Sequence, residues 1–126
     1  MSNVSLRHLV QMEAAGHERP AFVQNRCFAR LAWDHDVRAF CRERDIVYQG
    51  FSLLTANTDV LRTRLVASIA ARERATPAQV IFRFAQLVGM LPLTGTSSPE
   101  HMKQDLASRT VTLSADEVHA IETVAL

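Results

Sequence analysis

The chain has 126 residues, enough for one domain that buries roughly two thirds of the surface of its unfolded chain. Its hydrophobic share of 48% and charged share of 21% are typical of a soluble globular protein. The formal net charge of +1 gives no electrostatic case for binding DNA, RNA or an anionic membrane.

The cysteine content and the length of the apolar segments indicate the cellular location to expect. The two cysteines, Cys27 and Cys41, do not make a disulfide framework. No basic-then-apolar leader opens the sequence, and no apolar run reaches the ~18 residues that a membrane span needs. We therefore expect a cytoplasmic protein that does not cross a membrane.

Helices and strands are expected to alternate from the start of the chain. Helical spacing of apolar residues predicts a helix over residues 4–16, capped by Ser2 or Asn3. A strand follows over residues 21–28, where β-forming residues gather after a proline.

A second helix and strand complete the first half. Asp34 or Asp36 is expected to cap a helix over residues 36–45. Residues 46–54 are rich in branched and aromatic side chains without strict alternation, which favours a strand buried on both faces, as in parallel sheets. A polar loop is expected over residues 55–59.

The second half is marked by strong helix-capping patterns. Thr76 with Gln79, and Ser114 with Glu117, have the spacing of capping boxes. Pro99, next to a capping Ser98, suits the first position of a helix. The predicted elements are helices over residues 61–74 and 76–89, a strand over residues 90–96, and helices after Ser98 and after Ser114.

This order of elements, α-β-α-β-α-α-β-α-α, predicts parallel strands joined by right-handed crossovers. Three parallel strands are few, and both edges of such a sheet would present unpaired backbone groups. We therefore expect the chain to be part of a larger fold, unless its sheet edges are shielded in some other way.

The stretch PLTGTSSPEHMKQDL, residues 92–106, places a hydroxyl-rich turn between a strand and a helix. A helix start with free N–H groups suits an anion such as phosphate. A short, well-capped connector is the other interpretation, and the residues alone favour it.

Three further functional interpretations are disfavoured. Cys27, Cys41 and His35 lack the spacing of metal ligands. Residues 34–36, Asp-His-Asp, could suggest a hydrolase triad with Ser52, but no strand–Gly-x-Ser-x-Gly–helix elbow is present. The helix expected at 76–89 is too apolar for a DNA-binding element.

Residues 1–12, 20–57, 75–106 and 113–124 together resemble the C-terminal half of the aldo-keto reductases. The resemblance covers essentially the whole chain, in order. Because that family folds as a (β/α)₈ barrel of ~250 residues, it implies an α/β half of a TIM barrel, with about three parallel strands and flanking helices. Residues 1–126 would then form one domain.

The resemblance also implies a dinucleotide site. Ser2, Asn3 and Gln24 match residues that hold the nicotinamide carboxamide, and Phe51 falls where an aromatic, usually Tyr, stacks on the nicotinamide ring. The implied cofactor-binding residues are Ser2, Asn3, Gln24, Phe51, Ser52, Leu54, Thr94, Gly95, Thr96, Ser97, His101, Gln104 and Asp105.

The remaining residues of this set fall into two groups. Ser52, Leu54 and the loop that follows them would run along the pyrophosphate, and residues 94–105 would cradle the adenosine 2′-phosphate. In that cradle Gly95 replaces a common Lys and His101 a common Arg, so the expected cofactor is NADP or NAD.

The family's catalytic Tyr, Lys, Asp and His all lie in the N-terminal half, and no residue here maps onto them. Tyr48, the only tyrosine, is not assigned to that role. The chain is therefore expected to be inactive alone. It would be the cofactor half of a reductase, a dinucleotide-binding remnant, or a structural half-barrel that pairs with another copy or with a complementary half.

Overall fold

The computed structural model describes every residue from Met1 to Leu126. The helices are α1 (Leu6–Ala14), α2 (His35–Glu43), α3 (Thr58–Leu61), α4 (Arg64–Glu73), α5 (Pro77–Leu87), α6 (Pro99–Ala107) and α7 (Ala115–Thr123). The strands are β1 (Phe22–Arg26), β2 (Val47–Phe51) and β3 (Leu91–Pro92), and two 3₁₀ turns are η1 (Ala29–Asp34) and η2 (Ser108–Thr110). The α/β class and the order of the main elements are as predicted.

The strands form one parallel sheet in the order β1-β2-β3. A further extended stretch, Met1–Asn3, lies beside β1 through a parallel bridge between Ser2 and Gln24. Two backbone hydrogen bonds hold it, from Gln24 N–H to Met1 O (2.8 Å) and from Asn3 N–H to Gln24 O (2.9 Å). We call Met1–Asn3 the edge segment.

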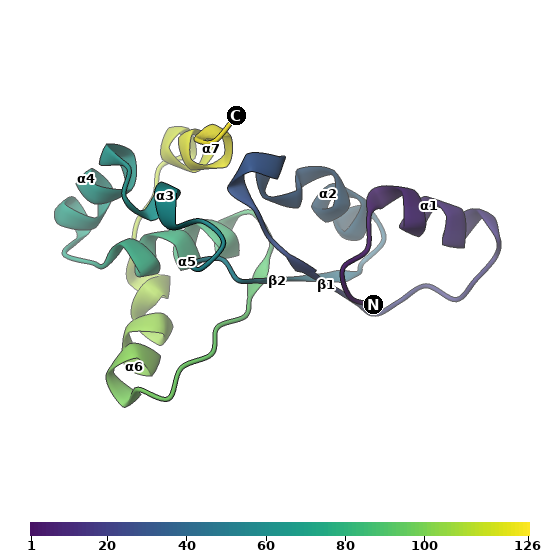
Figure 1. Ribbon diagram of the computed structural model, residues 1–126, viewed down its shortest axis with the longest axis horizontal. Coiled ribbons are helices and arrows are strands. Elements are labelled where there is room, and N and C mark those ends of the chain that lie inside the picture. The colour runs from purple at the N-terminus through teal and green to yellow at the C-terminus, as the bar shows by residue number, and fades with distance from the viewer.

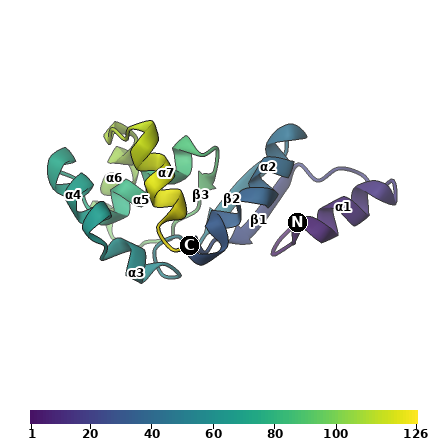
Figure 2. The same ribbon diagram turned by 90° about the horizontal axis from the view of Figure 1, so that it is seen from above.

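The two faces of the sheet differ in their surroundings. Val23, Asn25 and Tyr48 are buried on one face, which helices cover. In Figure 1, α1, α2 and α7 all lie on the same side of β1 and β2, and no helix lies on the other side; Figure 2 shows α2 over the same two strands. The uncovered side is named the open face, with Phe22, Gln24, Arg26, Val47, Gln49, Phe51 and Leu91, all exposed or half-buried. The expectation that residues 46–54 are buried on both faces is therefore wrong for this chain by itself.

The hydrophobic core lies between the covered face and the helices, chiefly α5. The rings of Trp33 and Phe84 meet there with centroids 5.1 Å apart. The predicted capping boxes are confirmed at the starts of α5 and α7, and the predicted cap Ser98 accepts a hydrogen bond from His101 N–H at the start of α6.

Two predicted helix caps are wrong. The first helix begins at Leu6, and its cap is Ser5, whose Oγ accepts from His8 N–H. Ser2 and Asn3 are instead held beside β1. Asp34 precedes α2 but has left-handed backbone geometry (φ 59°) and makes no capping hydrogen bond. Its carboxylate instead accepts hydrogen bonds from side chains of β1 and β2.

Other boundaries differ because chain turns intervene. The third strand has two residues instead of the predicted 90–96, since its partner β2 ends at Phe51 and the next residue, Ser52, turns away with φ 56°. The helix predicted over 61–74 starts only at Arg64, because Thr63 Oγ1 accepts from Val66 N–H and caps α4. The short helix α3 precedes it and includes residues 58 and 59, which were predicted as loop. The turn η1 has no counterpart among the predicted elements.

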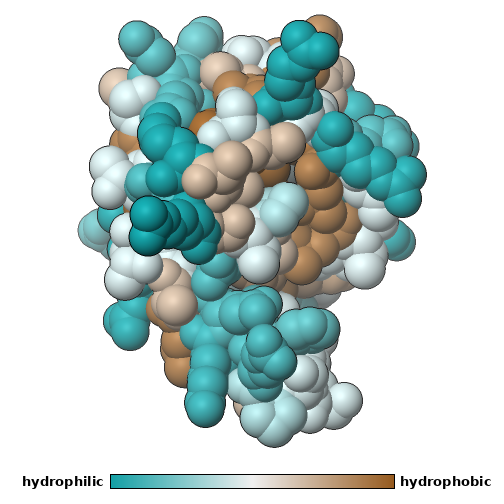
Figure 3. Space-filling model, turned by 90° about the vertical axis from the view of Figure 1, so that its left-hand side faces the viewer, coloured by the Kyte–Doolittle hydropathy of each residue, from teal (hydrophilic) through white to brown (hydrophobic).

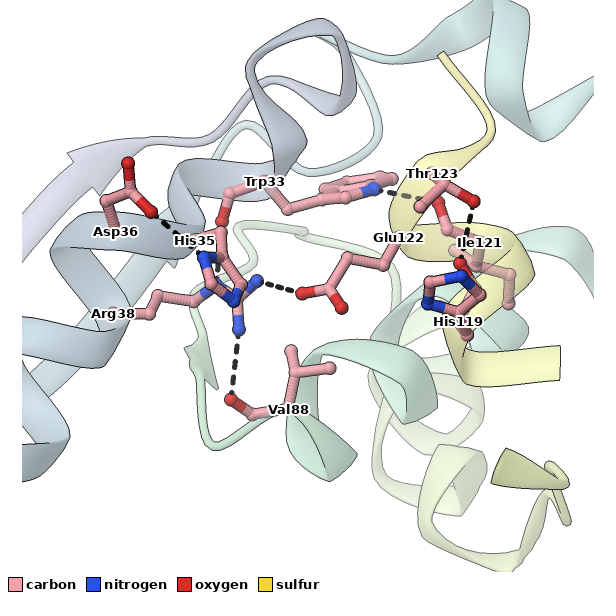
Figure 4. A network of polar contacts seen from close by, with 9 residues as sticks. All are labelled: Trp33, His35, Asp36, Arg38, Val88, His119, Ile121, Glu122 and Thr123. Atoms are coloured by element: carbon pink, nitrogen blue, oxygen red, sulfur yellow. Dashed lines mark hydrogen bonds and ion pairs between the residues drawn. The ribbon is translucent and has the colours of Figure 1, made fainter. Parts of the chain in front are cut away.

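A buried arginine joins three parts of the covered side (Figure 4). Arg38 of α2, only 5% exposed, donates from Nε to Trp33 O (2.7 Å) and from a terminal nitrogen to Val88 O (3.2 Å). Its other terminal nitrogen forms an ion pair with Glu122 of α7. These contacts connect η1, the end of α5 and α7, and we call them the Arg38 clamp.

Helix α6 projects from the body of the fold and buries none of its residues. Figure 3 faces this end of the molecule, where polar side chains surround a strip of apolar ones and α6 forms the lower lobe. None of the helices combines the length and apolar character needed to span a bilayer.

Candidate functional site

Two loops meet beyond the carboxyl ends of β2 and β3 and enclose a cleft of about 370 Å³. Ligands of parallel α/β folds bind at this end of the strands. We name it the loop cleft; its lining is Phe51, Ser52, Leu53, Leu54, Thr55, Phe82, Leu93, Thr94 and Gly95. Its volume is within the range of small-molecule sites, roughly 300–1,000 Å³.

Backbone geometry sets the direction of the first loop. Ser52 has φ 56°, in the left-handed region that residues other than glycine seldom adopt. Such conformations persist where the surrounding structure enforces them, often beside functional sites. The turn at Ser52 ends β2 and directs residues 53–55 along the wall of the loop cleft.

Asn57 holds this loop from behind. Its side-chain oxygen accepts from Ala29 N–H (2.7 Å), and its amide nitrogen donates to Cys27 O (2.9 Å) and Leu53 O (2.8 Å). The side chain is buried, and these three bonds tie the loop after β2 to the end of β1. The first wall of the cleft is therefore fixed by a fully paired side chain.

The second loop connects β3 to α6 through local hydrogen bonds. Thr94 Oγ1 donates to Asp105 Oδ2 (3.2 Å), and Thr96 Oγ1 accepts from Ser98 N–H (3.1 Å). The carbonyl of Gln104 accepts from Gln79 Nε2 (2.8 Å), which attaches α6 to α5. A carboxylate, Asp105, therefore stands directly behind the loop.

A second hollow, of about 440 Å³, lies on the open face and is lined by Met1, Ser2, Phe22, Gln24 and Gln49. Gln24 Nε2 donates to Gln49 Oε1 (3.2 Å). The register pairs Arg26 with Phe51, so Gln24 lies two residues before the level of Phe51. This is about 7 Å along the strands, and the hollow therefore neighbours the loop cleft.

The predicted site residues thus fall into separate groups. The loop cleft brings together Phe51, Ser52, Leu54, Thr94 and Gly95, while Ser2 and Gln24 line the second hollow. Six others line neither space: Asn3, Thr96, Ser97, His101, Gln104 and Asp105. Asn3 Oδ1 accepts from Arg26 N–H, and Asp105 contacts Thr94 on the far side of the loop.

Sequence reasoning missed Phe82 and Gln49 as lining residues, and it included Thr55 only as part of the loop after Leu54. Thr55 directly follows Leu54 in a predicted polar loop, so its position was a usable signal. Phe82 lies on the apolar stripe of a helix, and nothing in the sequence distinguishes it from an ordinary core residue.

The other reactive side chains lie away from the cleft. Tyr48 is buried, its hydroxyl donates to Asp34 Oδ2 (2.7 Å), and burial raises the pKa of this phenol. Burial also raises the pKa of the free thiols, to about 12 for Cys27 and about 11 for Cys41. No three His, Cys, Asp or Glu side chains are grouped as a metal site would require.

Comparison with known proteins places these observations in context. No protein-family model matches the chain. An aldo-keto reductase of Mycolicibacterium vanbaalenii is 30% identical over 122 residues, which cover 97% of this chain and 43% of that protein. The chain thus spans less than half the length of this curated relative.

Solved structures give the same picture. An aldo-keto reductase from a Medee basin deep-sea metagenome library, MGS-M4, matches with a TM-score of 0.85 at 21% identity, over 98% of this chain and 46% of that one. A variant of Gox0644 in complex with NADPH matches with a TM-score of 0.81 at 26% identity, over 96% of this chain and 44% of that one. The fold of this chain is therefore a part of a larger barrel.

Proposed function

This chain belongs to the aldo-keto reductase family, whose C-terminal half it matches in sequence and fold, and we propose that it supplies the cofactor-binding side of an NAD(P)H-dependent reductase of aldehydes or ketones. The observation that carries the proposal is the loop cleft, because it unites five of the predicted cofactor residues from two loops at the carboxyl ends of parallel strands. NADPH in the Gox0644 variant supports the same ligand class.

In this proposal each part of the site has a separate role. Phe51, half-buried at the end of β2, offers a ring face for the nicotinamide, and Ser2 and Gln24 lie nearby on the open face for its carboxamide. The loop from Ser52 to Thr55 follows the pyrophosphate. When bound, NAD(P)H supplies the hydride.

Acidic side chains lie at the end of the site where the adenosine 2′-phosphate of NADPH would bind. The Asp105 carboxylate contacts Thr94, and Glu100 lies in the first turn of α6. The only basic residues of that helix are His101 and Lys103. Like charges near a phosphate weaken its binding. We therefore expect NADPH to bind no more tightly than NADH.

The chain is proposed to bind cofactor without supplying the general acid. Tyr48 faces the covered side, its hydroxyl donates a hydrogen bond to Asp34 Oδ2, and it does not line the loop cleft. General acid–base catalysis contributes roughly 10²- to 10⁴-fold to rate. We therefore expect the 126-residue chain alone to show no carbonyl reduction above background.

Fluorescence titration of the chain with NADH and with NADPH tests the proposal. Phe51→Ala should weaken binding by about tenfold or more, because aromatic stacking on a base is worth ~1–3 kcal/mol. Phe28→Ala is the matched control, since Phe28 is also half-buried but lines neither hollow. Saturable binding that responds equally to both substitutions would contradict the assignment, and so would no saturable binding at all.

A further inference from the structure

The open face and the two free edges of the sheet form one continuous unpaired surface. We propose that a second copy of this chain covers it, with the edge segment of each copy beside β3 of the other, so that two chains close one eight-stranded parallel barrel. The proposal concerns assembly and does not depend on cofactor binding.

The outer edge beside β1 has free backbone groups. Met1 O and Asn3 N–H are directed to Gln24, so the N–H and C=O of Ser2 between them point away from β1. Ser2 makes no backbone hydrogen bond of its own. One donor and one acceptor are therefore available on this edge.

The edge at β3 is complementary. Leu93 N–H donates to Gly50 O (2.8 Å), so the groups on either side of it, Pro92 C=O and Thr94 N–H, point away from β2. Thr94 N–H has no hydrogen-bond partner in the chain. Proline has no N–H to offer, but its carbonyl still accepts. This edge therefore also presents one acceptor and one donor.

Strand number and direction fit closure by two copies. The edge segment adds a fourth parallel segment, through a single bridge, to the three-stranded sheet of β1, β2 and β3. A two-fold axis along the strand direction places β3 of each copy beside the edge segment of the other and keeps all strands parallel. Two sets of four give eight strands, the number whose interior side chains just fill.

The apolar side chains of the open face are suited to being covered by the open face of a second copy. Phe22, Val47 and Leu91 are 50%, 41% and 48% exposed, which is a high exposure for apolar strand residues. Val47 and Leu91 also line a hollow of about 570 Å³ at the outer edge of β3. In the proposed dimer, Met1 and Phe22 of the second copy would lie at this hollow. The open face has no Asp or Glu and one charged side chain, Arg26 at the end of β1, and the net charge is +1 per chain.

Sedimentation equilibrium of the 126-residue chain tests the proposal, together with the substitutions Val47→Asp and Val10→Asp. Val10 is the matched control, because it is 48% exposed on α1 and lies outside the open face. We expect a dimer at micromolar concentration. Val47→Asp should weaken it by about a hundredfold or more, since burying an unpaired carboxylate is strongly disfavoured. Val10→Asp should leave it unchanged.

Hydrogen exchange provides a second measurement that needs no substitution. The amides of Ser2 and Thr94 should be protected in the dimer and should lose that protection on dilution. A monomer at all accessible concentrations would overturn the proposal, as would a dimer that resists Val47→Asp. A dimer in which the Ser2 and Thr94 amides exchange freely would also overturn it.

Discussion

Among the polar clusters of this fold, we expect the Arg38 clamp to cause the largest loss in the free energy of unfolding when it is broken. Arg38→Met retains the apolar stem but removes the ion pair with Glu122 and the donors to Trp33 O and Val88 O. Removing one partner of a buried ion pair costs about 3–5 kcal/mol. Glu122 is 23% exposed and keeps part of its hydration, which argues against the top of that range. We expect a loss of about 4 kcal/mol.

Urea denaturation at fixed protein concentration measures this loss, because association would otherwise shift the apparent stability. Far-UV circular dichroism reports the helices, and the fluorescence of Trp33 reports the clamp itself (Figure 4). In a thermal scan the same loss corresponds to a fall in midpoint of about 12–20 °C for a domain of this size.

Arg72→Met is the matched control. Arg72 likewise pairs with a carboxylate of α7, Glu117, and donates to a carbonyl, Thr112 O, with Glu73 as a second and more distant carboxylate at 3.9 Å, but its side chain is 51% exposed. It should lower the unfolding midpoint far less, since exposed ion pairs contribute little. Equal losses for Arg38→Met and Arg72→Met would refute the reasoning from burial. A double-mutant cycle of Arg38→Met with Glu122→Gln that gives no coupling would refute the assigned partner.

Three further outcomes follow from the same physical arguments. Asn57→Ala should cost about 3 kcal/mol in urea denaturation, because three buried backbone groups lose their partner; a loss typical of a surface site would contradict this. Gly50→Ala should lower the free energy of unfolding by about 1–3 kcal/mol, because its Cβ would lie 2.2 Å from Met90 Sδ. Adding Met90→Ala should recover part of the loss. Strictly additive losses would argue against the clash. The folded state raises the pKa of Cys27 to about 12 and of Cys41 to about 11 from an ordinary 9.0, so it holds these protons while the unfolded chain releases them. The free energy of unfolding should therefore be constant below pH 9 and fall as pH rises from there through the folded pKa values; no fall across that window would exclude this linkage.

Local signals explain which parts of the fold were predictable. The capping boxes at Thr76 and Ser114 depend on contacts within three residues, so the sequence carries all the information they need. Asp34 is the opposite case. Its carboxylate is held by Asn25 and Tyr48, from two strands whose alignment no local pattern reveals.

The candidate site was predictable to the extent that it follows strand ends. Phe51 and Thr94 lie at or just after the ends of β2 and β3, but only the resemblance assigned them to the site, because the local pattern extended the two strands to residues 54 and 96. Phe82 reaches the same cleft from the middle of a helix, and only the packing of α5 against the sheet places it there. The pairing of Gln24 with Gln49 likewise depends on strand register.

Stability and ligand recognition are placed on different sides of this sheet. The Arg38 clamp and the core lie on the covered side, away from the open face. Gln24 and Phe51 belong to the open face, and the loop cleft begins where that face ends. A polypeptide that covers the open face would therefore enclose the proposed nicotinamide position without contacting the Arg38 clamp. Asn57 is the exception, because it is buried in the covered side and also fixes a wall of the cleft. Loss of Asn57 should consequently affect both folding and ligand binding, whereas changes on the open face should affect assembly and binding alone.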